Sequence, residues 1–141
     1  MKQESTITFI KNMTFDVELG GHHFDIDAGA KVGGENNGPS PKGLLLSALG
    51  GCTGMDAVSI LRKMKVTDYE LKIEVSGELT DEHPKIYHTI TVEFKFIGNN
   101  LPKSKLRKAV ELSETKYCGV SEMLRKSSEI KTIIYINGDE I

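Results

Sequence analysis

The sequence has only two cysteines, no tryptophan and no excess of positive charge. Cys52 and Cys118 are too few for a disulfide scaffold or a four-cysteine zinc site, and neither belongs to a CxxC pair. The net charge of −2 leaves no basic excess to hold a phosphate backbone, so nucleic-acid binding is not expected. No glycine pair is followed by the Lys-Ser/Thr of a phosphate-binding loop, and we therefore expect no nucleotide cofactor.

The N-terminal end also lacks an apolar signal region, because residues 1–10 mix charged, polar and apolar types. This predicts a cytoplasmic protein whose thiols are reduced at rest. What is present is ordinary for a globular protein: 141 residues, 38% of them hydrophobic and 27% charged. This length predicts one domain over residues 1–141.

The first forty residues predict strands followed by a loop. Residues 15–19 alternate apolar and acidic side chains, and the alternation resumes after Gly20-Gly21 with Phe24 and Ile26 against Asp25 and Asp27. This pattern is typical of a hairpin with a glycine turn, and residues 7–9 predict an earlier strand. Residues 33–40 are rich in turn formers, and Pro41 suits the first position of a following helix.

A helix is predicted from about Lys42 to Lys65. No residue between Gly43 and Met55 is charged, and the apolar and small residues surround the helix, so we expect burial on all sides. Asp56 interrupts the run and argues against a membrane span. Gly50, Gly51 and Gly54 would each cost about 1 kcal/mol relative to alanine, which indicates tight packing, for which the same helix of a second subunit is a candidate. We therefore expect a homodimer.

The remainder predicts a hairpin, a helix and a last strand. Residues 71–79 and 86–96 alternate along two long strands around a Thr80–Pro84 turn. A helix begins near Pro102 and ends at Cys118-Gly119, a short amphipathic piece follows, and residues 130–137 read as a strand.

Each cysteine has two open interpretations. Free cysteine is most often a small buried hydrophobe, and Cys52 lies within the predicted buried helix. The glycines beside Cys52 would permit close approach of a substrate, whereas Asp56, one turn later on the same face, opposes thiolate formation. Cys118 lies at a helix end. Together they form the minimum set for a peroxidatic and a resolving thiol.

The histidines give weaker indications. His22 and His23 follow the glycine turn and are expected in solvent, with no further ligands placed for a metal. His83 belongs to a turn. His88 has the strand parity of the apolar face, which favours a hydrogen-bonded core histidine over a catalytic base.

Several motifs in order resemble the OsmC/Ohr family, the osmotically inducible and organic hydroperoxide resistance proteins. They are Gly38-Pro39-Ser40-Pro41, Leu44-Leu45-Leu46, Ala48-Leu49-Gly50-Gly51-Cys52-Thr53, Asp56 and Lys116-Tyr117-Cys118-Gly119-Val120. The resemblance implies an OsmC-like α+β fold, an intertwined homodimer with antiparallel sheets wrapped around long central helices. It also implies thiol-dependent reduction of organic hydroperoxides, with Cys52 peroxidatic, Cys118 resolving, a dithiol such as a lipoyl group as reductant, and no cofactor or metal.

The chain departs from that family at two supporting positions. Family members use an N-terminal arginine to hold the thiolate and a glutamate after the helix-opening proline to hold the arginine. Here the first arginine is Arg62, and Lys42 and Gly43 follow Pro41. The pattern is similar to a Gly-Gly-Cys branch of the family, with Lys11 or Lys42 as a candidate replacement charge.

Two other functions remain open. The chain could be a dimeric protein that binds a small molecule without turnover, with Cys52 in the pocket wall, which the missing arginine and glutamate favour. It could also be a cysteine acyltransferase that uses His88 as its base, which requires a contact between Cys52 and His88.

Overall fold

The computed structural model describes all 141 residues and divides them into two compact units, Met1–Leu45 and Leu46–Ile141. The strands form a three-stranded and a four-stranded sheet, and together with the helices they make an α+β fold. The α+β prediction is confirmed. The single domain over residues 1–141 stays a prediction.

The first unit is an antiparallel meander. Its strands are β1 (Ser5–Lys11), β2 (Thr14–Leu19) and β3 (His22–Ile26), in that spatial order. Gly20 and Gly21 both have positive φ angles, which glycine adopts at little cost, and they turn β2 into β3 in the predicted hairpin. A single 3-10 turn, η1 (Ala30–Val32), precedes the predicted loop.

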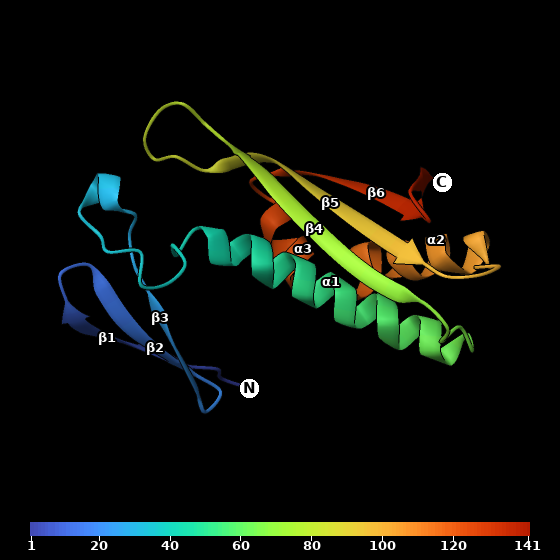
Figure 1. Cartoon of the computed structure of the whole chain (residues 1–141), viewed down its shortest axis with the longest axis horizontal. Helices are drawn as coiled ribbons and strands as arrows, with labels where there is room; N and C mark the ends of the chain where they lie inside the picture. The colour runs from blue at the N-terminus through green and yellow to red at the C-terminus, as the bar shows by residue number, and fades with distance from the viewer. The chain divides into compact units, whose positions relative to one another are not determined.

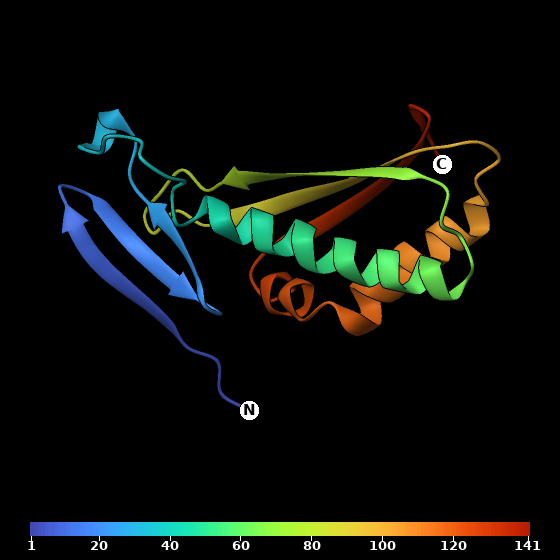
Figure 2. The same cartoon turned by 60° about the horizontal axis from the view of Figure 1, so that its bottom comes forward.

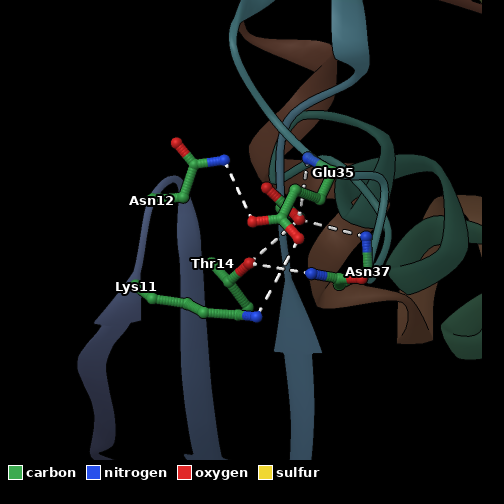
Figure 3. A network of polar contacts seen from close by, with 6 residues as sticks. Lys11, Asn12, Thr14, Glu35 and Asn37 are labelled. Atoms are coloured by element: carbon green, nitrogen blue, oxygen red, sulfur yellow. Dashed lines mark hydrogen bonds and ion pairs between the residues drawn. The ribbon is translucent and has the colours of Figure 1, made fainter.

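A buried carboxylate organises that loop. Asp27 is only 3% exposed, and its carboxylate accepts hydrogen bonds from Thr14 Oγ1 at 2.9 Å and from the backbone N–H groups of Asn37 at 3.0 Å, Ala28 at 2.7 Å and Glu35 at 3.3 Å. Figure 3 shows this network beside β2 and β3. These hydrogen bonds, that of Asn37 foremost, hold the pKa of Asp27 below its usual value. Asp27, which the alternation predicted on the polar face of the strand, therefore follows the end of β3, is buried and anchors the loop.

The second unit packs helices on one face of a sheet. The elements are α1 (Gly43–Lys63), β4 (Glu70–Leu79), β5 (Tyr87–Ile97), α2 (Lys103–Leu112), the π turn η2 (Ser113–Tyr117), α3 (Gly119–Arg125), β6 (Glu129–Ile136) and β7 (Asp139–Glu140). Figure 1 shows α1 running along β4, and Figure 2 shows the three helices on the same face of the sheet. The predicted helices and strands are all present.

The sheet order is β4-β5-β6-β7, with β5 and β6 parallel. The β4–β5 hairpin is antiparallel as predicted, and α2, the π turn and α3 form the long crossover that a parallel pair requires. Leu49, Ala57 and Leu61 of α1 are fully buried in the same core cluster as Phe94 and Phe96 of β5. This core fixes the position of α1 against the sheet.

Within one chain, α1 is not buried on all sides as predicted. Its buried face carries Leu49, Thr53, Gly54, Ala57 and Leu61. Its other face exposes Ala48, Gly51, Met55 and Ser59, whose spacing of three or four residues places them in one stripe. We call these four residues the open stripe of α1. Met55 is 76% exposed, which is unusual for a large apolar side chain in a central helix.

Two of the helix glycines serve packing inside the chain. A Cβ atom on Gly50 would lie 2.9 Å from Val75 Cγ2, and one on Gly54 would lie 2.7 Å from Ile73 Cδ1. The absence of side chains at these positions therefore allows β4 to approach α1 closely. Of these three glycines only Gly51 has no atom within 4 Å of its Cβ position, and the contact with a second subunit stays a prediction for Gly51 alone.

The composition of α1 also corrects the argument that Asp56 speaks against a membrane span. With 21 residues and a mean hydropathy of 1.6 over its most apolar window, α1 is long and apolar enough to cross a membrane. One such helix is weak evidence for a membrane span, because the core helix of a soluble protein has the same length and composition.

Candidate active site

The two cysteines and one carboxylate converge between α1 and the start of α3. Cys52 and Asp56 are one helical turn apart on α1, so their side chains lie on the same face, as predicted. Cys118 reaches that face from the far end of the α2 segment. The two sulfur atoms and a carboxylate oxygen of Asp56 all lie within 4.8 Å of one another.

The π turn η2 delivers Cys118 to this position. After α2 the chain widens into one π turn, closed by a hydrogen bond of 2.7 Å from the Cys118 N–H to the Ser113 carbonyl. The backbone then becomes extended at Cys118, which caps α3 by accepting a hydrogen bond at Sγ from the Ser121 N–H at 3.3 Å. Isolated π turns often occur at functional sites because they reposition the residues that follow.

The two thiols differ in exposure. Cys118 is 3% exposed, whereas Cys52 is only partly buried. Burial, and next the neighbouring Cys52 thiol, raise the pKa of Cys118 to about 11, although the Ser121 N–H opposes that rise. Cys118 is therefore a protonated, shielded thiol at neutral pH, and Cys52 is the thiol that a substrate can reach.

Ser113 lies beside Asp56. The Ser113 hydroxyl is fully buried and lies 3.2 Å from the Thr53 carbonyl and 3.4 Å from a carboxylate oxygen of Asp56, in position to donate to either. Asp56 forms none of the ion pairs in the chain. Nothing in the sequence pointed to Ser113, because a serine on the buried face of an amphipathic helix is ordinary.

A hollow of about 310 Å³ opens beside Asp56. Its other lining residues are Ser59, Ile60, Lys63, Met64, Leu112 and Tyr117. Most of this lining is aliphatic or aromatic, and Asp56 is shared between the hollow and the pair of thiols. The hollow can therefore receive an apolar group next to the site.

Other predicted candidates lie elsewhere. His88 is exposed rather than in the core, because it stands at the start of β5; its Nδ1 lies 2.9 Å from Thr89 Oγ1 and its Nε2 lies 3.9 Å from Glu78. His22 and His23 are exposed as predicted, and Asp16 raises the pKa of His23 through a hydrogen bond. Lys11, the candidate replacement charge, lies 3.9 Å from Glu35.

Comparison with known proteins places this arrangement in a family. The model of the family described as "OsmC-like protein" matches residues 34–133. Protein YhfA of Escherichia coli K12 is 30% identical over 128 residues, which cover 90% of this chain and 92% of that protein. The range matched by the family model, residues 34–133, contains Cys52, Asp56 and Cys118.

Solved structures share the fold. A hypothetical protein from Aquifex aeolicus VF5 is 28% identical, with 99% of each chain covered and a TM-score of 0.86. An organic hydroperoxide resistance protein, OsmC, from Legionella pneumophila is 14% identical, with 96% of this chain and 97% of that chain covered and a TM-score of 0.69. At that identity the second likeness concerns the fold alone. The family model and the YhfA relative both span most of the chain, and the chain belongs to the OsmC-like protein family.

Proposed function

We propose that this protein is a thiol-dependent peroxidase that reduces organic hydroperoxides, with Cys52 as the peroxidatic and Cys118 as the resolving cysteine. The observation that carries the proposal is the position of the two thiols, whose sulfur atoms lie within 4.8 Å of each other although they come from distant segments. A pair of reduced cysteines at this separation is suited to reversible disulfide formation.

The difference in exposure supports the assignment of the two roles. Cys52 is the more accessible thiol, and its thiolate attacks the distal oxygen of the hydroperoxide, so that the O–O bond breaks. The alkoxide leaves and takes up a proton to give an alcohol, and Cys52 becomes a sulfenic acid. The raised pKa of Cys118 keeps that thiol protonated and unreactive towards peroxide in the meantime.

Cys118 then closes the cycle. Its sulfur attacks the sulfenic sulfur of Cys52, water leaves, and a Cys52–Cys118 disulfide forms. An external dithiol, such as a lipoyl group, reduces this disulfide by exchange and is itself oxidised to a disulfide. The side chains of Ile60, Met64, Leu112 and Tyr117 in the hollow beside Asp56 support a substrate with a hydrocarbon group rather than hydrogen peroxide.

The proposal includes the setting in which the site works. We expect a homodimer in the cytoplasm, with neither nucleic acid nor membrane as a partner, and a chain of the Gly-Gly-Cys type. The open stripe of α1 supports the homodimer, because a second copy would cover Met55 and Gly51.

One equivalent of cumene hydroperoxide tests the proposal. Intact-mass analysis of the reduced protein should show the loss of two hydrogens, and peptide mapping should locate a Cys52–Cys118 disulfide. Cys118→Ser should stop at a sulfenic acid on Cys52 that dimedone traps. Cys52→Ser is the matched control and should leave Cys118 unmodified. Folded protein with two free thiols after prolonged exposure would contradict the proposal.

A second candidate function rests on a cavity in the first unit. A hollow of about 390 Å³ is lined mainly by apolar residues, Ile7, Met13, Phe15, Ile26, Val32 and Pro41 among them. This volume suits a small apolar ligand and favours a binding function, although Cys52 does not line this hollow as the binding hypothesis expected. The two functions separate experimentally, because binding of an apolar ligand there should survive Cys52→Ser whereas peroxide reduction should not.

A further inference from the structure

We propose that the reduced site binds one thiophilic divalent cation, Zn²⁺, through Cys52 Sγ, Cys118 Sγ and a carboxylate oxygen of Asp56. These three donor atoms lie within 4.8 Å of one another and come from only two rigid positions, the middle of α1 and the cap of α3. Counting cysteines in the sequence excludes a four-cysteine site but not this mixed donor set.

The donor set matches the coordination that zinc prefers. Zinc binds cysteine sulfur at about 2.3 Å and carboxylate oxygen at about 2.0–2.2 Å in a tetrahedral arrangement, so neighbouring donors are separated by about 3.4–3.8 Å. Donors that lie within 4.8 Å of one another need to approach by at most about 1.0–1.4 Å. Three protein ligands leave the fourth position for water, as in zinc sites that keep an open position.

Charge and hydrogen bonding favour the cation. Asp56 has no Lys, Arg or His partner within ion-pair distance, so two thiolates and this carboxylate would together place three uncompensated negative charges in a partly buried site. A divalent cation neutralises two of them and displaces the two thiol protons into solvent. The Ser113 hydroxyl beside Asp56 then acts as an outer partner that orients the ligand.

Binding of the cation and formation of the Cys52–Cys118 disulfide exclude each other, but binding does not depend on peroxidase activity. The cation requires both sulfurs as thiolates, so it shields them from oxidants, and a Cys52–Cys118 disulfide has no thiolate left to bind. Because only reduced thiols and Asp56 are needed, the cation would bind whether or not the protein turns over hydroperoxides.

Cadmium titration tests the site in the fully reduced, full-length protein. Cd²⁺ bound to thiolate absorbs in the ultraviolet, and the absorbance should saturate at one ion per chain. Zn²⁺, added against a chromophoric chelator, should displace it. Asp56→Asn should weaken both ions by more than Ser113→Ala, for which we expect about 10-fold. Cys118→Ser should abolish saturable binding. Circular dichroism should show that each variant is folded.

Two matched controls make the outcome decisive. Asp81→Asn removes an exposed carboxylate in the β4–β5 turn and should leave the affinity unchanged. The double variant His22→Ala/His23→Ala removes the other cluster of metal-ligating side chains and should also bind one ion. Affinity that is the same in Asp56→Asn and the parent, or lost in the histidine variant, would overturn the proposal. Peroxide oxidation is measured on metal-free protein, so failure of this site and failure of the proposed function are distinguishable.

Discussion

Replacement of Gly51 by leucine tests whether a second copy of the chain covers the open stripe of α1. No atom lies within 4 Å of the Cβ position of Gly51, so the new side chain meets nothing inside its own chain. Leucine is also a better helix former than glycine by about 0.8 kcal/mol. In an isolated chain, Gly51→Leu should therefore raise the free energy of unfolding by about that amount.

The sign reverses if a partner packs on Gly51. Overpacking of a close contact costs about 1–3 kcal/mol, and two-fold symmetry applies it twice, so the dimer loses about 2–6 kcal/mol. The dissociation constant should then rise by roughly 30-fold to 20,000-fold. We expect this second outcome, and sedimentation equilibrium over nanomolar to micromolar concentrations measures it.

A matched variant separates assembly from folding. Gly50→Leu places its Cβ 2.9 Å from Val75 Cγ2 and should destabilise the chain itself at every concentration. Gly51→Leu should instead show a defect that high protein concentration reduces. The reasoning is refuted if Gly51→Leu dimerises like the parent with higher stability, or if the folded parent is monomeric at micromolar concentration.

Two further predictions follow from burial and charge. Iodoacetamide at pH 8 should alkylate Cys52 well before Cys118, because Cys118 is 3% exposed and its pKa is raised to about 11; peptide mapping over time checks the order, and equal rates would contradict it. Asp27 has a lowered pKa in the folded state, so its stabilising effect is present above its unfolded value of about 4 and is lost as the pH falls through the folded value. Asp27→Asn should therefore be less stable than the parent in urea at pH 7, and the difference should shrink as the pH falls below about 4; a constant difference would contradict this cause.

The periodicity of apolar residues predicted the helices and strands, but it does not say which residues from distant segments meet at a site. Alternation along residues 71–79 and 86–96 defined the long hairpin, because one face of those strands is buried. The parallel pairing of β6 with β5 could not be predicted, because the same alternation of side chains fits a parallel or an antiparallel neighbour. The α1 helix was predicted within two residues at each end, but its open stripe was not, because the apolar composition of a face does not say what covers it.

The candidate site shows the same division. Cys52 and Asp56 were predicted on one face because helical spacing dictates it. The proximity of Cys118 to them was predicted only from the resemblance to a family, because the number of residues between two positions does not determine their distance in space. His88 had the right parity but stands at the strand start, where the exposed end of a sheet overrides alternation. Asp27 looked like a polar strand residue; the clue was the asparagine-rich loop that supplies its backbone donors.

The distance along the chain between Cys52 and Cys118 couples oxidation to thermal stability. A disulfide between them would close a loop of about 65 residues, and restricting an unfolded chain in this way is worth roughly 4 kcal/mol in the chain-entropy description. The oxidised protein would therefore melt at a higher temperature than the reduced one. Reduction of the disulfide would also give up this stabilisation of the folded state. A dithiol is therefore favoured over a monothiol as reductant, because the closure of its own disulfide ring drives the exchange.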